Sequence, residues 1–197
     1  MKNLHYPLLI VTLFCCSFTQ ENNAQQPSCE WCGATEAPSN ITSSTTIADS
    51  SEKGERIKIS GTVYQPDGRT PAGDVILYVY HTNTEGVYPK KGNETGNGRR
   101  HGYLRSWIKT GSNGNYSFET IKPEPYPGRT VPAHIHITVK HQSKKEYWLK
   151  DFFFYGDNLL SEKDIKNETG EDRFNHVIRL IKQGELLAGK RDILLKN

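Results

Sequence analysis

The sequence lacks the long apolar runs of membrane-spanning proteins and the strong positive charge that favours nucleic-acid binding. Of its 197 residues, one is methionine and four are cysteine, and the formal net charge is only +3. So small a charge gives no electrostatic reason to expect nucleic acid as a partner. After the first twenty residues no apolar run approaches the roughly 20 residues that span a bilayer. Glycine (17) and proline (10) are frequent instead, which favours a turn-rich β protein over a helical bundle.

Residues 1–24 have the composition of a signal peptide. Lys2 supplies a basic start, and residues 6–16 form an apolar segment too short to cross a bilayer. Polar residues follow at once, so we expect export to a secreted or periplasmic location, with cleavage near Ala24. A buried N-terminal strand is one alternative. Another is a poor lipobox over residues 13–16, in which a cysteine carries a lipid anchor.

Cys29 and Cys32 are the two cysteines that remain after such a cleavage. A zinc site needs four ligands, and the chain has no second cysteine pair at this spacing. In an exported chain a local disulfide is the favoured state, with inert thiols and a redox or metal-binding role as alternatives. Residues 25–55 form a polar N-terminal arm that includes this cysteine pair. Within it, residues 33–55 are rich in serine, threonine and asparagine and predict a linker or a loosely attached arm.

From residue 56 onward apolar and polar residues alternate, as is typical of β-strands. We predict strands over residues 57–64, 74–81, 104–109, 115–121, 133–140 and 147–155, separated by turn signals. This spacing favours a mainly β fold, a β-sandwich of antiparallel strands with long active-site loops. We assign the sandwich to residues 56–160 and the less regular residues 161–197 to a C-terminal extension of the same domain.

The stretch PYPGRTVPAHIH (125–136) holds the candidate site. Side chains alternate faces along a strand, so His134 and His136 are expected to point one way and Ile135 the other. Two neutral imidazoles at this spacing can hold one metal ion, although such a pair alone is weak evidence. Tyr126 adds an oxygen donor with a reference pKa of about 10, which ionises at neutral pH only beside a strong Lewis acid such as Fe(III). Imidazoles with hard oxygen donors suit ferric iron better than metals that prefer thiolates.

Flanking motifs extend this pattern over residues 57–157. In order they are Gly61-Thr-Val, Gly86-Val-Tyr88, Arg100-His-Gly102, Lys109-Thr110, Gly114-Asn-Tyr116-Ser-Phe, Pro125-Tyr126-Pro127, Pro132-Ala-His134-Ile-His136 and Phe152-Phe-Phe-Tyr-Gly-Asp157. On these residues the chain resembles the intradiol ring-cleavage dioxygenases, and most of all the core of the protocatechuate 3,4-dioxygenase group. The combination of PYP and PAHIH is specific, whereas Gly-x-Tyr alone is not.

The resemblance implies an Fe(III) cofactor with four protein ligands, Tyr88, Tyr126, His134 and His136. It also implies that Tyr126 is the tyrosine that leaves the metal when substrate binds, and Tyr88 the one that stays. The implied activity is that of a dioxygenase that uses O2 to cleave a catechol-type ring between its two hydroxyl-bearing carbons. The implied product is a cis,cis-muconate-type diacid.

Some positions depart from the family's pattern or compete for a role. The arginine expected near the substrate is replaced by Val131, and Arg129 in the same loop is the candidate to act as a catalytic residue in its place. A glutamine expected before the aromatic run is Asp151 here. Tyr80 and Tyr103 compete with Tyr88 for the role of the second tyrosine ligand.

Two other functions fit parts of the pattern. A non-catalytic module of the transthyretin or carboxypeptidase-regulatory type shares the Gly61-Thr-Val and Gly114-Asn-Tyr-Ser-Phe features. An iron–catecholate binder with poor turnover would keep the metal site. For the enzyme, the expected partners are a small catechol and O2, with no nucleic acid and no membrane span. The sequence leaves the ring substituents and the formation of a homo-oligomer open.

Overall fold

The computed structural model describes residues 1, 29, 31–142, 144–165 and 171–197. Nearly all of the predicted signal peptide, including the alternative lipobox, therefore lies outside the described residues. Within the described part, no helix is both long enough and apolar enough to cross a bilayer. Cys29 and Cys32 are joined in a disulfide, which confirms the state favoured from the sequence.

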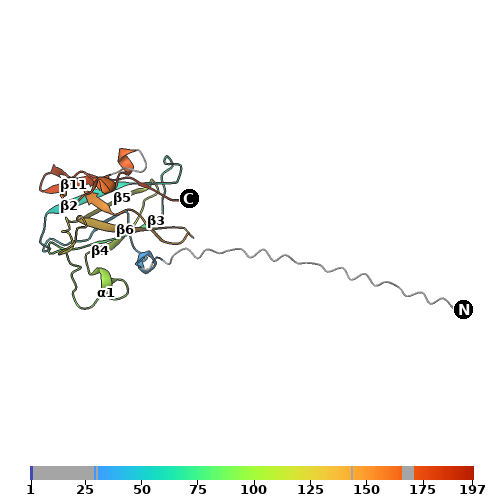
Figure 1. The fold of residues 1–197 in the computed structure, drawn as a ribbon, viewed down its shortest axis with the longest axis horizontal. Helices are drawn as coiled ribbons and strands as arrows, with labels where there is room; N and C mark the ends of the chain where they lie inside the picture. Colours follow the sequence, from blue (N-terminus) through green and yellow to red (C-terminus); the bar gives the residue numbers. More distant parts are fainter. Residues whose placement is uncertain (2–28, 30, 143, 166–170) are drawn as a thin grey trace.

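Two six-stranded sheets pack face to face, which confirms the predicted β-sandwich (Figure 1). One sheet has the order β1-β5-β2-β11-β10 with β12 beside β2, and the other has the order β4-β3-β6-β8-β9 with β7 beside β6. The strands are β1 (Ser44–Thr46), β2 (Arg56–Tyr64), β3 (Val75–His81), β4 (Arg105–Lys109), β5 (Asn115–Ile121), β6 (His134–His141), β7 (Tyr147–Trp148), β8 (Phe152–Phe154), β9 (Val177–Ile178), β10 (Ile181–Gln183), β11 (Leu186–Lys190) and β12 (Ile193–Leu194). The helical segments are η1 (Ala34–Glu36), α1 (Gly98–His101), α2 (Glu162–Ile165) and η2 (Asp172–Phe174).

The period-two pattern of the strands builds the core between the sheets. Every second residue of β2 is buried, because its apolar side chains face the opposite sheet. Phe118 of β5 and Phe152 of β8 meet edge to face across the core, with ring centroids 5.9 Å apart. Ile135 and Ile137 of β6 belong to the same core and are fully buried. The intervening residues of β6 therefore lie on the outer face of their sheet.

The sandwich is not purely antiparallel, which corrects one part of the prediction. Four strand pairs are parallel: β1 with β5, β11 with β2, β12 with β2, and β8 with β9. In each of them, one strand comes from an end of the chain and adds to a strand of the central domain. Parallel neighbours need a long connection rather than a hairpin, so local turn signals do not reveal them.

The segment predicted to be a linker contributes to the fold. Its residues Ser44–Thr46 form β1 against the edge of β5, and the next residues pack inward, with Ala48 only 1% exposed. The polar composition of residues 25–55 hides this docking, because backbone hydrogen bonds rather than apolar side chains hold β1.

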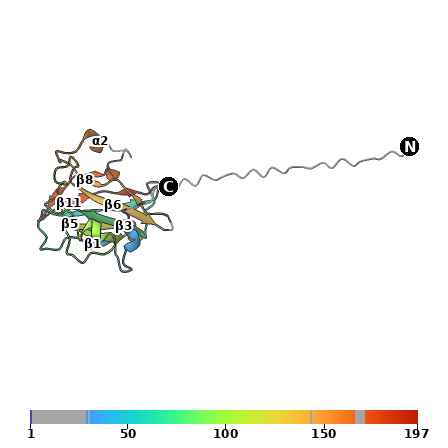
Figure 2. The same ribbon diagram turned by 60° about the horizontal axis from the view of Figure 1, so that its bottom comes forward.

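Two further differences concern the C-terminal half. The run predicted as one strand over residues 147–155 is divided into β7 and β8, with residues 149–151 outside the ladder. Residues 161–197 complete both sheets, since β9 extends the sheet of β8 and β11 lies beside β2. The short α2 lies at the edge of the molecule beyond β8 (Figure 2).

Candidate metal centre

The two histidines of β6 point together from the outer face of the sheet. His134 and His136 lie with their Nε2 atoms 3.1 Å apart and their ring centroids 4.4 Å apart. Ile135 between them is fully buried in the core on the other face. The strand therefore presents the two imidazoles as the sequence predicts.

Hydrogen bonds on the far side of each ring fix which nitrogen carries the proton. His134 Nδ1 lies 2.7 Å from the carbonyl oxygen of Pro132, and His136 Nδ1 lies 3.1 Å from Asp151 Oδ1. A carbonyl oxygen and a carboxylate only accept hydrogen bonds, so both Nδ1 atoms are the protonated ones. Both Nε2 atoms then direct lone pairs toward the same point, as they do in metal sites whose histidines are oriented from behind.

Two tyrosine hydroxyls complete this cluster. Tyr126 Oη lies 2.9 Å from His136 Nε2, and Tyr88 Oη is hydrogen-bonded to Tyr126 Oη. The structure thus brings together the four side chains predicted as metal ligands. The competing tyrosines do not share this hydrogen-bonded cluster. The Tyr80 ring stacks on His101 and packs beside His136, but among the described residues no hydrogen bond joins its hydroxyl to the four predicted ligands. Tyr103 Oη donates to Glu52 Oε2 at 2.7 Å.

The Tyr88 loop is shaped by Asn83 and Gly86. Asn83 Oδ1 accepts hydrogen bonds from the backbone N–H groups of Glu85 and Val87, at 3.0 and 3.1 Å. Gly86 has a φ of +71°, and a Cβ added there would lie 2.0 Å from the carbonyl oxygen of Pro125. Only glycine combines this backbone conformation with so close an approach.

The Tyr126 loop is joined directly to the Tyr88 loop. Thr82 Oγ1 donates to the carbonyl oxygen of Glu124 at 2.7 Å, and Glu124 N–H donates to the carbonyl oxygen of Asn83 at 3.2 Å. Pro127 restricts Tyr126, the residue before it, to an extended backbone. The two tyrosines are therefore held on paired loops, whereas the histidines belong to a strand.

Burial sets the charge of the cluster when no metal is bound. Burial raises the pKa of both tyrosines, Tyr88 and Tyr126, because the charged phenolate loses its solvation. Burial lowers the pKa of His134, followed by the effect of the neighbouring His136. At neutral pH, burial therefore favours the neutral forms of both phenols and of the His134 imidazole.

A hydrogen count shows that this cluster suits a cation. Tyr126 can donate one hydrogen to His136 Nε2, but the contact between the two Nε2 atoms contains no hydrogen when both rings are protonated at Nδ1. His134 Nε2 is thereby left as a buried acceptor without a donor, which is costly. A metal ion bound by both imidazoles would satisfy it. Two phenolic oxygens and two imidazole nitrogens form a donor set suited to ferric iron.

Asp151 has a role that the sequence did not reveal. It was notable only as a departure from an expected glutamine, yet its carboxylate orients His136. Its side chain and that of His136 are 23% and 17% exposed, so the site is open to solvent on this side.

Arg129 is not joined to the cluster. It is exposed in the turn after Tyr126, where its backbone N–H donates to the Tyr126 carbonyl oxygen at 3.1 Å. Among the described residues, no contact links its guanidinium group to the four predicted ligands. Val131, which stands where the family's arginine is expected, is 40% exposed. Neither residue supplies a charge inside the cluster.

A prominent cavity of the described residues lies elsewhere. It measures about 700 Å³, lies against β10 and β11, and contains none of the four predicted ligands. The candidate site is therefore defined by hydrogen-bond geometry and not by this cavity.

Comparison with known proteins supports the same region. Residues 32–187 match the family model described as Dioxygenase. The chain is 33% identical over 118 residues to catechol 1,2-dioxygenase 1 of Acinetobacter lwoffii, covering 52% of this chain and 37% of that protein. It is 28% identical over 162 residues to the protocatechuate 3,4-dioxygenase beta chain of Burkholderia cepacia, covering 73% and 65%. The chain thus spans less than two thirds of the length of each of these relatives.

A solved structure shares the fold. The dioxygenase domain of a dioxygenase–carbohydrate-binding fusion protein from Streptomyces sp. SirexAA-E superposes with a TM-score of 0.58 at 22% sequence identity. The match covers 81% of this chain and 91% of that one. All four predicted ligands, from Tyr88 to His136, lie inside the stretch matched by the family model.

Proposed function

Because the chain belongs to the intradiol dioxygenase family, we propose that it is an Fe(III)-dependent enzyme that cleaves a catechol-type ring between its two hydroxyl-bearing carbons with O2. The proposed product is a cis,cis-muconate-type diacid. One observation supports this proposal above the others: Tyr88, Tyr126, His134 and His136 place two phenolic oxygens and two imidazole nitrogens around one point.

The side chains have distinct roles in this proposal. When bound, ferric iron activates the catechol ring toward O2. His134 and His136 hold the metal from a rigid strand, each oriented from behind by Pro132 or Asp151. Tyr126 Oη is the atom expected to take up a catechol proton, because burial raises its pKa and so favours the neutral phenol.

Colour and oxygen uptake test this function together. The protein purified from an iron-supplemented culture is expected to be burgundy, because tyrosinate-to-Fe(III) charge transfer gives a broad absorption band in the visible range. On addition of a catechol, it is expected to consume O2 and catechol in equal amounts. Absorption spectroscopy, an oxygen electrode and mass spectrometry of the diacid measure the outcome.

The alternatives give different results in the same measurements. A colourless, iron-free protein would refute the proposed dioxygenase activity. The non-catalytic β-sandwich module would then be the remaining interpretation. A coloured protein that consumes no O2 with catechols would support the iron–catecholate binder, which the Val131 and Asp151 departures suggest.

The carboxylate of Asp151 is expected to tune the metal affinity. Asp151→Asn keeps an oxygen that can accept from His136 Nδ1 but removes the negative charge beside the ligand. Loss of such an outer partner costs about 10- to 100-fold in metal affinity, so we expect a decrease in this range. Titration with Fe(III) in the presence of a competing chelator, followed in the visible band, gives the affinity.

Asp74→Asn is the matched control for this change. Asp74 is exposed and directly precedes β3, so it lies at the opposite end of that strand from Tyr80. The same loss of charge there is expected to leave iron binding unchanged. Equal affinities for the Asp151 variant and the original protein would disprove the role given to Asp151.

A further inference from the structure

Within the polar N-terminal segment, residues 31–36 lie on the same outer sheet face as the metal centre. From here on, the word arm means these six residues only. Ala34 packs in one buried cluster with Tyr78 and Tyr80 of β3. The backbone approaches so closely that a Cβ on Gly33 would lie 2.5 Å from the Tyr78 ring. Trp107 Nε1 of β4 donates to the Gly33 carbonyl oxygen at 2.6 Å. The arm is therefore a docked part of this sheet face.

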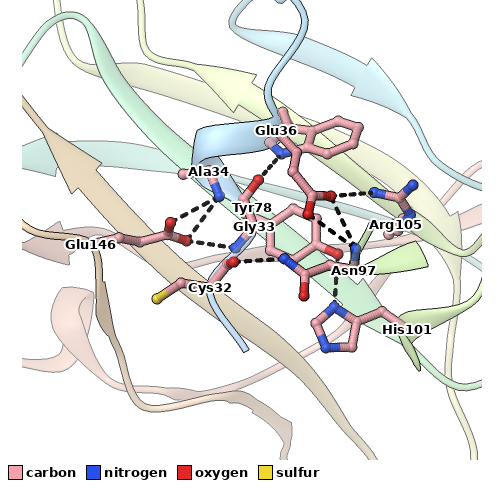
Figure 3. Close-up of polar contacts among 10 residues, drawn as sticks. Cys32, Gly33, Ala34, Glu36, Tyr78, Asn97, His101, Arg105 and Glu146 are labelled. Atoms are coloured by element: carbon pink, nitrogen blue, oxygen red, sulfur yellow. Dashed lines mark hydrogen bonds and ion pairs between the residues drawn. The ribbon is translucent and has the colours of Figure 1, made fainter. Parts of the chain in front are cut away.

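A carboxylate holds the arm from one side. Glu146, just before β7, accepts hydrogen bonds from the N–H groups of Gly33 and Ala34, at 3.0 and 2.9 Å (Figure 3). Its other contact is the hydroxyl of Thr138, which lies on β6 two residues after His136. The arm and the ligand-bearing strand thus share one acceptor.

A second carboxylate, from the arm itself, holds the loop of α1 on the other side. Glu36 accepts from the Asn97 N–H at 3.0 Å, and Arg105 lies 3.9 Å from the same carboxylate (Figure 3). Asn97 Nδ2 in turn donates to the Cys32 carbonyl oxygen at 2.7 Å. The arm thereby fixes the start of α1, the segment that ends in His101.

A series of ring contacts connects the arm to the predicted metal ligands. The Arg100 guanidinium lies 4.3 Å from the Trp31 ring centroid, and the Trp31 and His101 centroids are 6.1 Å apart. His101 stacks on Tyr80 at 3.7 Å with an interplanar angle of 4°. Tyr80 lies 4.6 Å from the ring centroid of His136. Displacement of Trp31 therefore loosens a packed column that ends at a proposed ligand.

We propose that the arm is a positioning element of the metal centre, and that the Cys29–Cys32 disulfide keeps it in place. The bond closes a short loop around Trp31, with Cys32 N–H donating to the Cys29 carbonyl oxygen at 3.1 Å. Without the bond, Trp31 gains conformational freedom that its contacts must overcome. The inference rests on the proposed function, because it concerns how that metal site is held.

The disulfide makes this support sensitive to reductants. A phosphine reductant supplies two electrons and is converted to the phosphine oxide with oxygen from water. The two cysteines take up the two hydrogens of that water and become thiols. The opened arm is expected to release Trp31 first, because this residue is 37% exposed.

The iron measurement uses variants and no reductant, since a reductant would also act on Fe(III). In Cys29→Ser/Cys32→Ser, iron release to a chelator is expected to be about 10-fold faster, in line with the loss of outer support. The visible band is expected to shift as well, which a loss of stability alone would not cause. Trp31→Ala should behave alike, whereas Trp31→Phe should restore slow release because it keeps a ring beside Arg100.

Glu146→Gln and Glu119→Gln separate the arm from general effects of charge. Glu119 pairs with Lys58 at 2.9 Å in the other sheet, so its replacement should leave release and band unchanged. Glu146→Gln weakens the acceptor for Gly33 and Ala34 and should accelerate release. The proposal would be overturned if three proteins released iron at the same rate and had the same visible band. These are the original protein and the Cys29→Ser/Cys32→Ser and Trp31→Ala variants.

Hydrogen exchange of the metal-free protein provides a measurement that does not depend on iron. Phosphine treatment is expected to speed amide exchange in Gly98–His101 and to leave Arg56–Tyr64 of β2 unchanged, because local opening governs exchange. Unchanged exchange in Gly98–His101 would also overturn the proposal. If the original protein binds no iron, the proposed function fails, while this exchange result still decides whether the disulfide holds the arm.

Discussion

His134→Ala is expected to abolish the visible band and to weaken ferric iron binding by more than about 100-fold. Loss of an outer partner alone costs about 10- to 100-fold, and this change removes one of two nitrogen donors. In the original protein the Nε2 atoms of His134 and His136 lie 3.1 Å apart. In the variant, His136 would have to bind the metal without this second imidazole. Visible spectra and the iron content per chain measure the result.

Two comparison variants make this prediction specific. His141→Ala changes a buried histidine at the far end of the same strand, beside Val75 of β3, and should keep both colour and iron. Tyr126→Phe should shift the band without bleaching it, because Tyr88 still supplies one tyrosinate. Unchanged colour in both the His134 and Tyr126 variants would refute the ligand assignment.

Gly86→Ala is expected to lower the free energy of unfolding by about 2–5 kcal/mol and to impair iron binding. A left-handed backbone costs a non-glycine residue about 1–2 kcal/mol, and forced overpacking adds about 1–3 kcal/mol. The overlap falls on the carbonyl oxygen of Pro125, next to Tyr126. To relieve it, the two tyrosine loops must separate, so urea denaturation and iron content should change together.

Gly92→Ala isolates the conformational part of this cost. Gly92 has a φ of +91°, and a Cβ there would meet nothing within 4 Å. It should lose only about 1–2 kcal/mol and retain its iron. If Gly86→Ala were no more harmful than Gly92→Ala, the close contact with Pro125 would have no part in assembling the site.

Local periodicity explains which features the sequence predicts well. Residues 115–121 were predicted as a strand and form β5 with the same bounds (Asn115–Ile121). The shared face of His134 and His136 follows from the same alternation, since each position depends only on its neighbours along the strand. Such features need no knowledge of what the strand packs against.

Contacts between distant segments explain what the sequence missed. The parallel pairing of β1 with β5 and of β11 with β2 joins parts of the chain that carry no mutual signal. The aromatic run over residues 147–155 has strand composition throughout, yet the backbone leaves the ladder before Asp151, whose carboxylate then meets His136. A local pattern cannot anticipate that contact with a histidine of another strand.

The choice among tyrosines shows the same limit. Tyr80 and Tyr88 are eight positions apart and chemically equal in sequence. Tyr80 lies on the strand and is stacked against His101, whereas Tyr88 lies on a loop whose partner loop carries Tyr126. The Tyr80 ring also packs beside His136, with centroids 4.6 Å apart, but only the pairing of the two loops joins a second tyrosine hydroxyl, that of Tyr88, to Tyr126 Oη.

The placement of the four predicted ligands on two loops and a strand would make a bound metal act as a cross-link. Tyr88 and Tyr126 are 38 residues apart, and Tyr126 and His136 are 10 residues apart. An ion held by all four side chains would close both of these chain loops, and loop closure costs chain entropy. Only the folded chain brings the four predicted ligands together, so if they bind iron, free iron would raise the unfolding temperature by mass action. Iron supply and the lifetime of the folded protein would then be linked quantities.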